Sequence, residues 1–382
     1  MKRNECRWAA PACCLALLVN GCASIIQPRD VVLIREPGQR RYSPPAPASA
    51  SAATLWPYAV LSANVYHGVW HDAPVDAASV SSGASSKPAA DALSPPSAAP
   101  GASAAPAAYA ASAAAAGVAE GGAVDPYVKA CVGDPQQFLP VQDWKSWPQF
   151  PSASLRTAAE GLGLYLEVWE NRSMSPPVVA VVFRGTEFRS WLDWESNLRW
   201  FARFIPKHED QYTLVSSRLG DEFVEESARR ALAMDAAGSA GVRVVSAGHS
   251  LGGGLAQHFA YSLPLKSKSG VETPRVDHVY AFDPSPVTGW FSVPADIREK
   301  NARRLVIDRV FEHGEILAYL RLVLSYAMPP SAERPAIREI RFNFRTGDAF
   351  ANHSMTRLAC DLALARHSSP AAATVPATTP RP

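Results

Sequence analysis

The sequence predicts an α/β fold, a mostly parallel β-sheet with helices on both faces. Continuous apolar and largely β-branched runs at Val178–Phe183 and Val242–Ala247 are typical of strands that are buried on both sides. Between them, Leu219–Met234 carries apolar residues at helical spacing. Strands that alternate with helices in this way favour a parallel sheet.

The same alternation continues along the chain. A helix of small residues is predicted over Gly253–Tyr261, directly after the second strand, and the first helix is predicted over Thr54–His67. Packed structure is expected from Gly163–Trp169 onward. The remaining expected elements are strands at His278–Phe282, Leu305–Phe311 and Ile337–Phe344 and a closing helix at Ser354–Ala365.

At 382 residues, the chain is long enough for one large domain with extensions. The segment 74–124 has almost no aromatic or β-branched side chains, so it cannot bury enough apolar surface to offset the entropy of ordering. We expect a signal segment at 1–21, a tether at 22–53, an N-terminal helix of the core at 54–73, a disordered insert at 74–124, an α/β domain at 125–367 and a disordered tail at 368–382.

Charge gives little information about partners. The formal net charge is +2, and charged residues make up 19% of the chain, which does not favour a nucleic-acid partner. The oligomeric state stays open.

The first residues have the pattern of a secretion signal. A basic start is followed by Trp8–Val19, an apolar stretch too short to span a bilayer as a stable helix. Leu18–Cys22 resembles the bacterial lipobox, which implies that Cys22 carries lipid and anchors the chain to a membrane. Ala23 favours the outer membrane by resemblance to lipoprotein sorting signals; the alternative is an ordinary secretory signal without lipid.

Two cysteines remain outside the signal segment and the lipobox. Cys131 precedes the core and Cys360 lies in the predicted last helix. In an oxidising compartment they are a natural disulfide pair. The alternative is a pair of buried free thiols.

Gly248-His249-Ser250-Leu251-Gly252 has the pattern G-x-S-x-G. It follows a predicted strand and opens a predicted helix, so Ser250 falls on the sharp turn that exposes a nucleophile in serine hydrolases. Gly248 and Gly252 allow the strand and helix to approach while Ser250 takes a strained conformation. The alternative is a structural turn with an idle serine.

A serine nucleophile needs a base, and the base needs an acid to orient it. Among the downstream histidines, His353 is favoured because it lies in a loop between the last strand and the final helix. Glu315 is the favoured acid because it lies just beyond a strand end. The alternative acids are Asp283 and, inside a strand, Asp308, and Glu312 is a further carboxylate near a strand end. The other downstream histidines are His258, His278, His313 and His367.

An oxyanion hole requires two preorganised N–H donors. The backbone of Leu251 is one candidate, and Thr186, in the turn after the first buried strand, is the other. The alternative is that Thr186 lies in an ordinary turn after a core strand and donates no hydrogen bond to a substrate.

Over about residues 160–365, the sequence resembles the class 3 lipases, the family that includes the fungal triacylglycerol lipases. The motifs that carry this resemblance are VVAVVFRGT followed by DWESNL, GHSLGGGLA and NHSMTRL. The resemblance implies an α/β-hydrolase fold and places Glu315, in RVFEHGEILAYL, where the family usually has Asp. In this family a lid often follows the oxyanion residue; Phe188–Phe204 is rich in aromatic residues and is either such a lid or ordinary core packing.

These observations predict a membrane-anchored serine hydrolase that cleaves carboxylic esters of lipids, as a lipase, an esterase or a phospholipase. Its substrate is a lipid or another ester, and the triad chemistry implies no metal or cofactor. Two alternatives remain: an acyltransferase with the same triad, and a non-catalytic lipoprotein that binds lipids or a partner.

Overall fold

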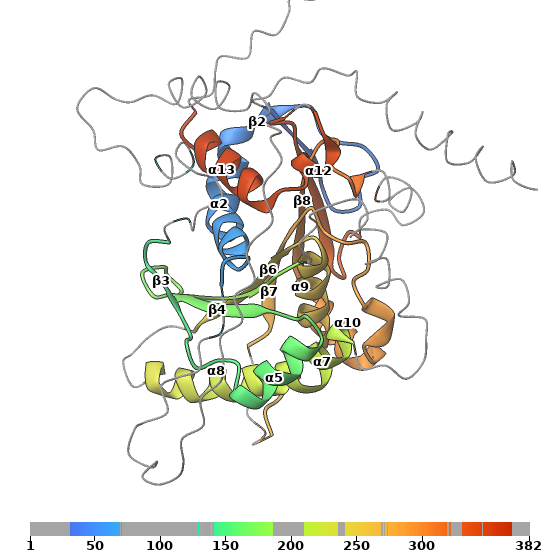
Figure 1. Ribbon diagram of the computed structural model, residues 1–382. Coiled ribbons are helices and arrows are strands. Elements are labelled where there is room, and N and C mark those ends of the chain that lie inside the picture. The colour runs from blue at the N-terminus through green and yellow to red at the C-terminus, as the bar shows by residue number, and fades with distance from the viewer. Residues whose placement is uncertain are drawn as a thin grey trace, which may run out of the picture.

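The computed structural model describes residues 31–68, 141–185, 210–235, 241–268, 274–318, 331–345 and 347–368, with a few single positions between these ranges. In this part of the chain, nine strands form one sheet in the order β2-β1-β9-β8-β7-β6-β5-β4-β3 (Figure 1). The strands are β1 Val31–Arg35, β2 Ala46–Pro47, β3 Trp144–Ser146, β4 Leu166–Asn171, β5 Val178–Phe183, β6 Arg243–His249, β7 Val276–Phe282, β8 Val306–Glu312 and β9 Ala336–Phe342.

The middle of the sheet is parallel and its two edges are antiparallel. Strands β5 to β9 lie side by side in chain order and run in one direction. Beyond β9 the sheet continues with β1 and β2, and beyond β5 with β4 and β3, all in antiparallel pairings. The chain therefore has an α/β fold with a mixed, mostly parallel sheet.

Helices cover both faces of this sheet (Figure 1). The connections between successive parallel strands carry α8, α9 and α10, which lie with α5 on one face. Helices α2 and α13, from opposite ends of the described chain, pack against each other on the other face. The helices are α2 Ala48–Asn64, α5 Ala153–Gly161, α7 Gln211–Leu214, α8 Gly220–Asp235, α9 Leu251–Ser262, α10 Ala295–Ala302, α12 Ala349–Asn352 and α13 Met355–Ala365, with a π-helical turn at Val215–Leu219 and a 3₁₀ turn at Trp290–Ser292.

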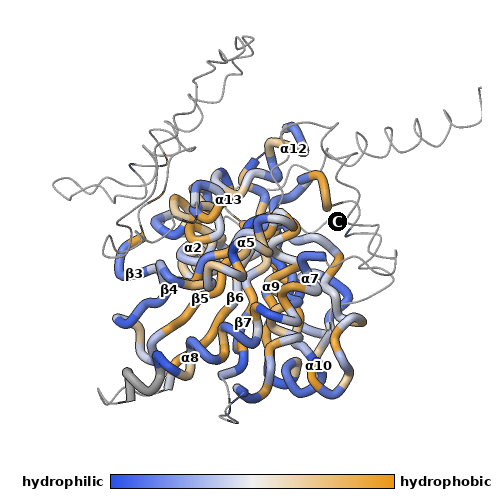
Figure 2. Tube along the Cα trace, turned by 60° about the horizontal axis from the view of Figure 1, so that its bottom comes forward, coloured by the Kyte–Doolittle hydropathy of each residue, from blue (hydrophilic) through white to orange (hydrophobic). Residues whose placement is uncertain are grey.

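Strand β5 is apolar and buried at every position. Val179, Val181 and Phe183 pack into the core with α5, α8 and α9. The residues between them, Val178, Ala180 and Val182, point to the other face and pack into the core with α2 and α13. Because successive side chains of a strand point to opposite faces, a strand between two helix layers is apolar at every position. Figure 2 shows these apolar colours along β5 and β6, between the helices.

The predicted tether at 22–53 is too long. Val31–Arg35 instead forms β1, which pairs with β9, and α2 begins at Ala48 rather than at Thr54. A short apolar strand in a Pro-, Arg- and Ser-rich segment is stabilised by pairing with a distant strand, which local composition does not reveal. Elements β3, α5 and α10 were not predicted either.

A disulfide joins Cys131 to Cys360 of α13, with 5.4 Å between the two Cα atoms. Both cysteines are buried. The bond ties the segment before the core to the last helix, which is the pairing that the sequence predicted.

Several predictions lie outside the described residues. They are the signal segment at 1–21, the lipidation site at Cys22, the insert at 74–124, Thr186, the aromatic segment Phe188–Phe204 and the tail from 369 onward. Within the ranges that are described, no helix is both long enough and apolar enough to cross a bilayer.

Candidate active site

Ser250 lies between the end of β6 and the start of α9, with φ 56° and ψ −122°. This backbone conformation is strained for a residue with a Cβ, and such strain is found mainly at functional sites. Two of its backbone hydrogen bonds join it to the end of β7 and the residues that follow: the Ser250 N–H donates to the carbonyl of Phe282 at 3.0 Å, and the Ser250 carbonyl accepts from the N–H of Ser285 at 2.9 Å. The end of β7 therefore fixes the turn that carries Ser250.

Gly252 allows α9 to begin directly against β5. A Cβ on Gly252 would lie 2.3 Å from the carbonyl oxygen of Phe183, which is closer than any carbon and oxygen can pack. The role predicted for this glycine, close approach of helix and strand, agrees with these contacts.

His353 is positioned by two elements that meet at its backbone. It follows α12 directly, and Ser354 caps the N-terminus of α13. The Nδ1 atom of His353 lies 2.7 Å from Oε2 of Glu315, and both side chains are buried. The centre of its ring lies 4.7 Å from that of His249, the residue before Ser250. The predicted base therefore lies beside the turn that carries Ser250 and is joined to the predicted acid.

Glu315 is fully buried, but its neighbours favour the ionised form of its carboxylate. Burial by itself would raise its pKa, but the guanidinium of Arg321 and the hydrogen bond with His353 hold the pKa of Glu315 below its ordinary value. The N–H of Leu317 also donates to Oε2 of Glu315, at 2.8 Å. Arg321 forms an ion pair with the same carboxylate.

Asp308, one of the alternative acids, has other partners. Its carboxylate accepts two hydrogen bonds from Arg338, at 2.7 and 2.8 Å, and lies 2.9 Å from Nε2 of His278. Although burial works in the other direction, the hydrogen bonds from His278 and Arg338 lower the pKa of Asp308. These residues form an ion-pair cluster of their own.

Asp283, the other alternative acid, lies at the end of β7 and close to the site. Its Oδ1 accepts a hydrogen bond from the N–H of Glu312 at 3.1 Å, and its Oδ2 lies 3.9 Å from Nε2 of His249. Burial and the nearby charge of Glu315 raise the pKa of Asp283 well above its ordinary value. Glu315, rather than Asp283, is thus the carboxylate that is hydrogen-bonded to His353.

The loop after β5 passes directly beside Ser250. A Cβ on Gly185 would lie 3.1 Å from the Cβ of Ser250 and 2.3 Å from the carbonyl oxygen of His249. Leu251 is the first residue of α9. The two regions in which oxyanion donors were predicted therefore meet at Ser250, although Thr186 itself is not among the residues that the structure describes.

Three residues of the site were not predicted. Arg321 pairs with Glu315, the ring of His249 packs beside His353, and the hydroxyl of Tyr66 lies 2.7 Å from Nδ1 of His249. The position of His249 inside the G-x-S-x-G motif was a usable signal. Tyr66 and Arg321 had none, because each reaches the site only through the fold.

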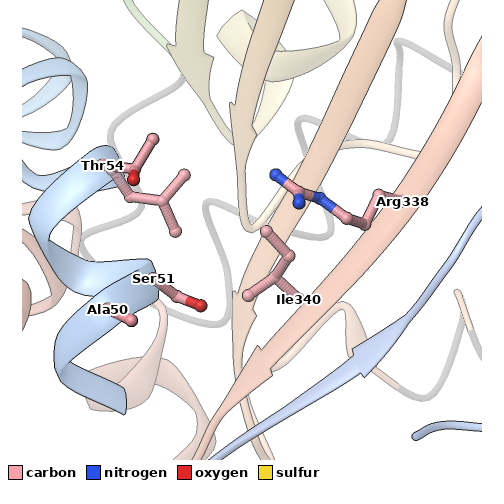
Figure 3. Close-up of a pocket in the computed structure, with 6 residues that line it drawn as sticks. Ala50, Ser51, Thr54, Arg338 and Ile340 are labelled. Carbon is pink, nitrogen blue, oxygen red and sulfur yellow. The ribbon is translucent and has the colours of Figure 1, made fainter. Parts of the chain in front are cut away.

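One cavity of the described chain lies away from these residues. It measures about 210 Å³ and lies between α2 and β9, where Arg338 and Ile340 face Ser51 and Thr54 (Figure 3). Its lining is completed by Ala50 and Leu55 and includes no residue of the predicted triad.

No protein-family model matches the chain, and no curated protein matches it either.

Proposed function

We propose that this chain is a serine hydrolase with an α/β-hydrolase fold, similar to the class 3 lipases, and that it cleaves carboxylic esters of lipids. The observation that carries the proposal is the strained conformation of Ser250 at the end of β6, beside the buried pair of His353 and Glu315. A nucleophile at a strand-to-helix turn, a histidine and a carboxylate on its Nδ1 are the three parts of a triad.

The proposed reaction has two steps. In the first, His353 takes the hydroxyl proton of Ser250 while Oγ forms a bond to the acyl carbon, and the proton then passes to the leaving alcohol as its bond to that carbon breaks. In the second, a water molecule gives a proton to His353 and attacks the acyl-enzyme, which releases the carboxylic acid and restores Ser250. Glu315 holds the imidazole in the required tautomer.

The N–H groups of Leu251 and Thr186 are the proposed oxyanion donors. We also propose that lipid on Cys22 anchors the enzyme to the bacterial envelope, at the outer membrane, where lipid esters are at hand.

The test compares the full-length chain in detergent with Ser250→Ala on p-nitrophenyl esters of short and long chain length and on phospholipid vesicles. We expect turnover to fall at least about 1,000-fold in Ser250→Ala, because no other group in the triad can form the acyl-enzyme. Ser292→Ala, which removes an exposed hydroxyl, should retain turnover.

A p-nitrophenyl phosphonate provides a second measurement that does not depend on the choice of ester. It should attach covalently to Ser250, as seen by mass spectrometry of the peptide. Equal turnover in Ser250→Ala and the unmodified chain, or no labelling of Ser250, would contradict the proposal. Labelling with turnover only after an alcohol or lysolipid acceptor is added would indicate an acyltransferase.

A further inference from the structure

Asp283 has a set of features that the proposed triad does not explain. It is fully buried, and its φ of 38° lies in the left-handed region, which a residue with a side chain rarely adopts. Oδ2 of Asp283 has no hydrogen-bond partner among the described residues. A buried carboxyl oxygen without a partner is costly, and its presence calls for a physical explanation.

His249 presents a second such atom to the same space. Its side chain is buried, and Nε2 has no hydrogen-bond partner in the described part of the chain. Nε2 lies 3.9 Å from Oδ2 of Asp283, which is too far for a hydrogen bond. Two ligands of one tetrahedral zinc ion lie about 3.3 Å apart, given bonds of about 2.0 Å, so a small movement would let both atoms bind one cation.

A nitrogen of His353 lies close to both of these side chains. One nitrogen of His249, one nitrogen of His353 and one oxygen of Asp283 all lie within 4.8 Å of one another. His249 is the last residue of β6, Asp283 directly follows β7, and His353 lies in the segment after β9, so three parts of the sheet bring them together.

We propose that His249, Asp283 and His353 bind a divalent transition-metal cation, with Zn²⁺ as the best fit, and that this cation inhibits the hydrolase. Two imidazoles and one carboxylate favour Zn²⁺ or Co²⁺ over Mg²⁺ and Ca²⁺, which prefer oxygen ligands. The inhibition rests on the proposed function, whereas the binding site does not.

Both histidines already have the outer partners that metal-binding histidines need. Nδ1 of His353 is held by Glu315, and Nδ1 of His249 by the hydroxyl of Tyr66. When Nδ1–H of His249 donates to Tyr66, Nε2 carries the lone pair that binds a metal. Such partners fix the tautomer and raise the basicity of the ligand.

Metal binding and catalysis then compete for one atom. Because Nδ1 of His353 is hydrogen-bonded to Glu315, Nε2 is the nitrogen that would bind the cation. In the proposed reaction, Nε2 is also the atom that takes the proton of Ser250. A bound cation therefore removes the base.

The first test is calorimetric titration of untagged, full-length protein with ZnCl₂, together with the visible absorption of the CoCl₂-treated protein. We expect one ion per chain, and a Co²⁺ spectrum of nitrogen and oxygen ligands. His249→Gln and Asp283→Asn should weaken binding at least about 100-fold, and Tyr66→Phe about 10- to 100-fold. MgCl₂ and CaCl₂ should not compete.

His278→Gln is the matched control, because it removes a partly buried histidine that is also paired with a carboxylate. It should bind Zn²⁺ as the unmodified chain does. Absence of binding, or binding that is equal in all variants or equally weakened in His278→Gln, would overturn the site. If a site variant does not fold, broadening of the His249 and His353 imidazole NMR signals by Co²⁺ in the unmodified chain decides the question.

The effect of Zn²⁺ on ester hydrolysis tests the proposed inhibition separately from the binding. We expect Zn²⁺ to inhibit turnover at the concentrations at which it binds, and EDTA to restore the turnover. Binding without inhibition would overturn the competition for His353. Binding in a chain that hydrolyses no ester, even without metal, would leave the metal site standing and contradict the proposed function.

Discussion

At the scale of single residues, the charge on Glu315 depends on Arg321. The carboxylate is fully buried, and burial alone would favour its neutral form. Arg321 contributes the largest opposing effect on the pKa of Glu315, ahead of the hydrogen bonds from His353 and from the backbone of Leu317. An ionised partner on Nδ1 is what stabilises an imidazolium during acyl transfer.

Arg321→Gln should therefore change the pH dependence of ester hydrolysis. Without the guanidinium, the pKa of Glu315 rises, so its carboxylate becomes protonated at a higher pH. We expect the acid limb of the kcat profile to move to higher pH and kcat at neutral pH to fall about 10-fold or more. The control is Arg338→Gln, whose carboxylate partner is Asp308. Superimposable profiles for Arg321→Gln and the unmodified chain would contradict this role.

Glu312 gives a pH dependence of stability. Burial raises the pKa of Glu312 to about 8, from an ordinary value of 4.5. The folded state therefore favours the neutral carboxyl of Glu312. The stability that this preference contributes is fully present below pH 4.5 and is lost as pH rises through about 8. We expect the free energy of unfolding to fall between pH 6 and pH 9, and expect this fall to be smaller in Glu312→Gln.

Urea denaturation at the two pH values measures this difference. The exposed residue Glu333, changed to Gln, serves as the control and should keep the fall of the unmodified chain. An equal fall in Glu312→Gln would show that other groups cause it.

At the scale of elements, the turn from β6 to α9 is tightly constrained. Ser250 takes a strained conformation, and Gly252 touches the backbone at the end of β5. The surrounding backbone hydrogen bonds hold this geometry, so the proposed nucleophile would be positioned before any substrate binds.

Gly252→Ala should consequently be strongly destabilising. The added methyl group would meet the carbonyl oxygen of Phe183 at 2.3 Å, and backbone cannot move aside cheaply. We expect a loss of at least about 3 kcal/mol in the free energy of unfolding. Gly161→Ala, in α5, meets no atom within 4 Å and should be neutral or gain up to about 1 kcal/mol. Thermal unfolding of both variants checks the contrast, which equal stabilities would contradict.

At the scale of the whole molecule, distant parts of the described chain meet on one side. Strand β1 pairs with β9, and α2 packs against α13. The disulfide between Cys131 and Cys360 closes a loop of 229 residues in the same layer. This layer also carries Tyr66, just after α2, and His353, just before α13.

Removal of the disulfide should destabilise the fold as a unit. Changing both cysteines to Ser frees the unfolded chain from a long loop, and we expect a loss of about 2–5 kcal/mol. Urea denaturation of the double variant measures this loss. The unmodified chain with a reductant should lose a similar amount, and no loss in either case would show that the bond does not stabilise the fold.

The sequence by itself determined the parallel part of the sheet. Strand β5 was predicted with its observed bounds, and β6, α9 and α13 within a few residues, because apolar periodicity is a local property of the chain. Ser250 was equally local, since a motif between a strand and a helix defines it. The sequence also named Glu315 and His353, but left Asp283 and Asp308 open as acids.

Only the tertiary structure decided the features that depend on distant contacts. It joined Glu315 to His353, gave Asp308 other partners, and paired β1 with β9 across about 300 residues. It also brought Tyr66, His249 and Arg321 to the site. The physical reason is the same in each case: burial and hydrogen-bond partners set the charge of a carboxylate and the stability of an edge strand, and both are supplied by residues that are far away in sequence.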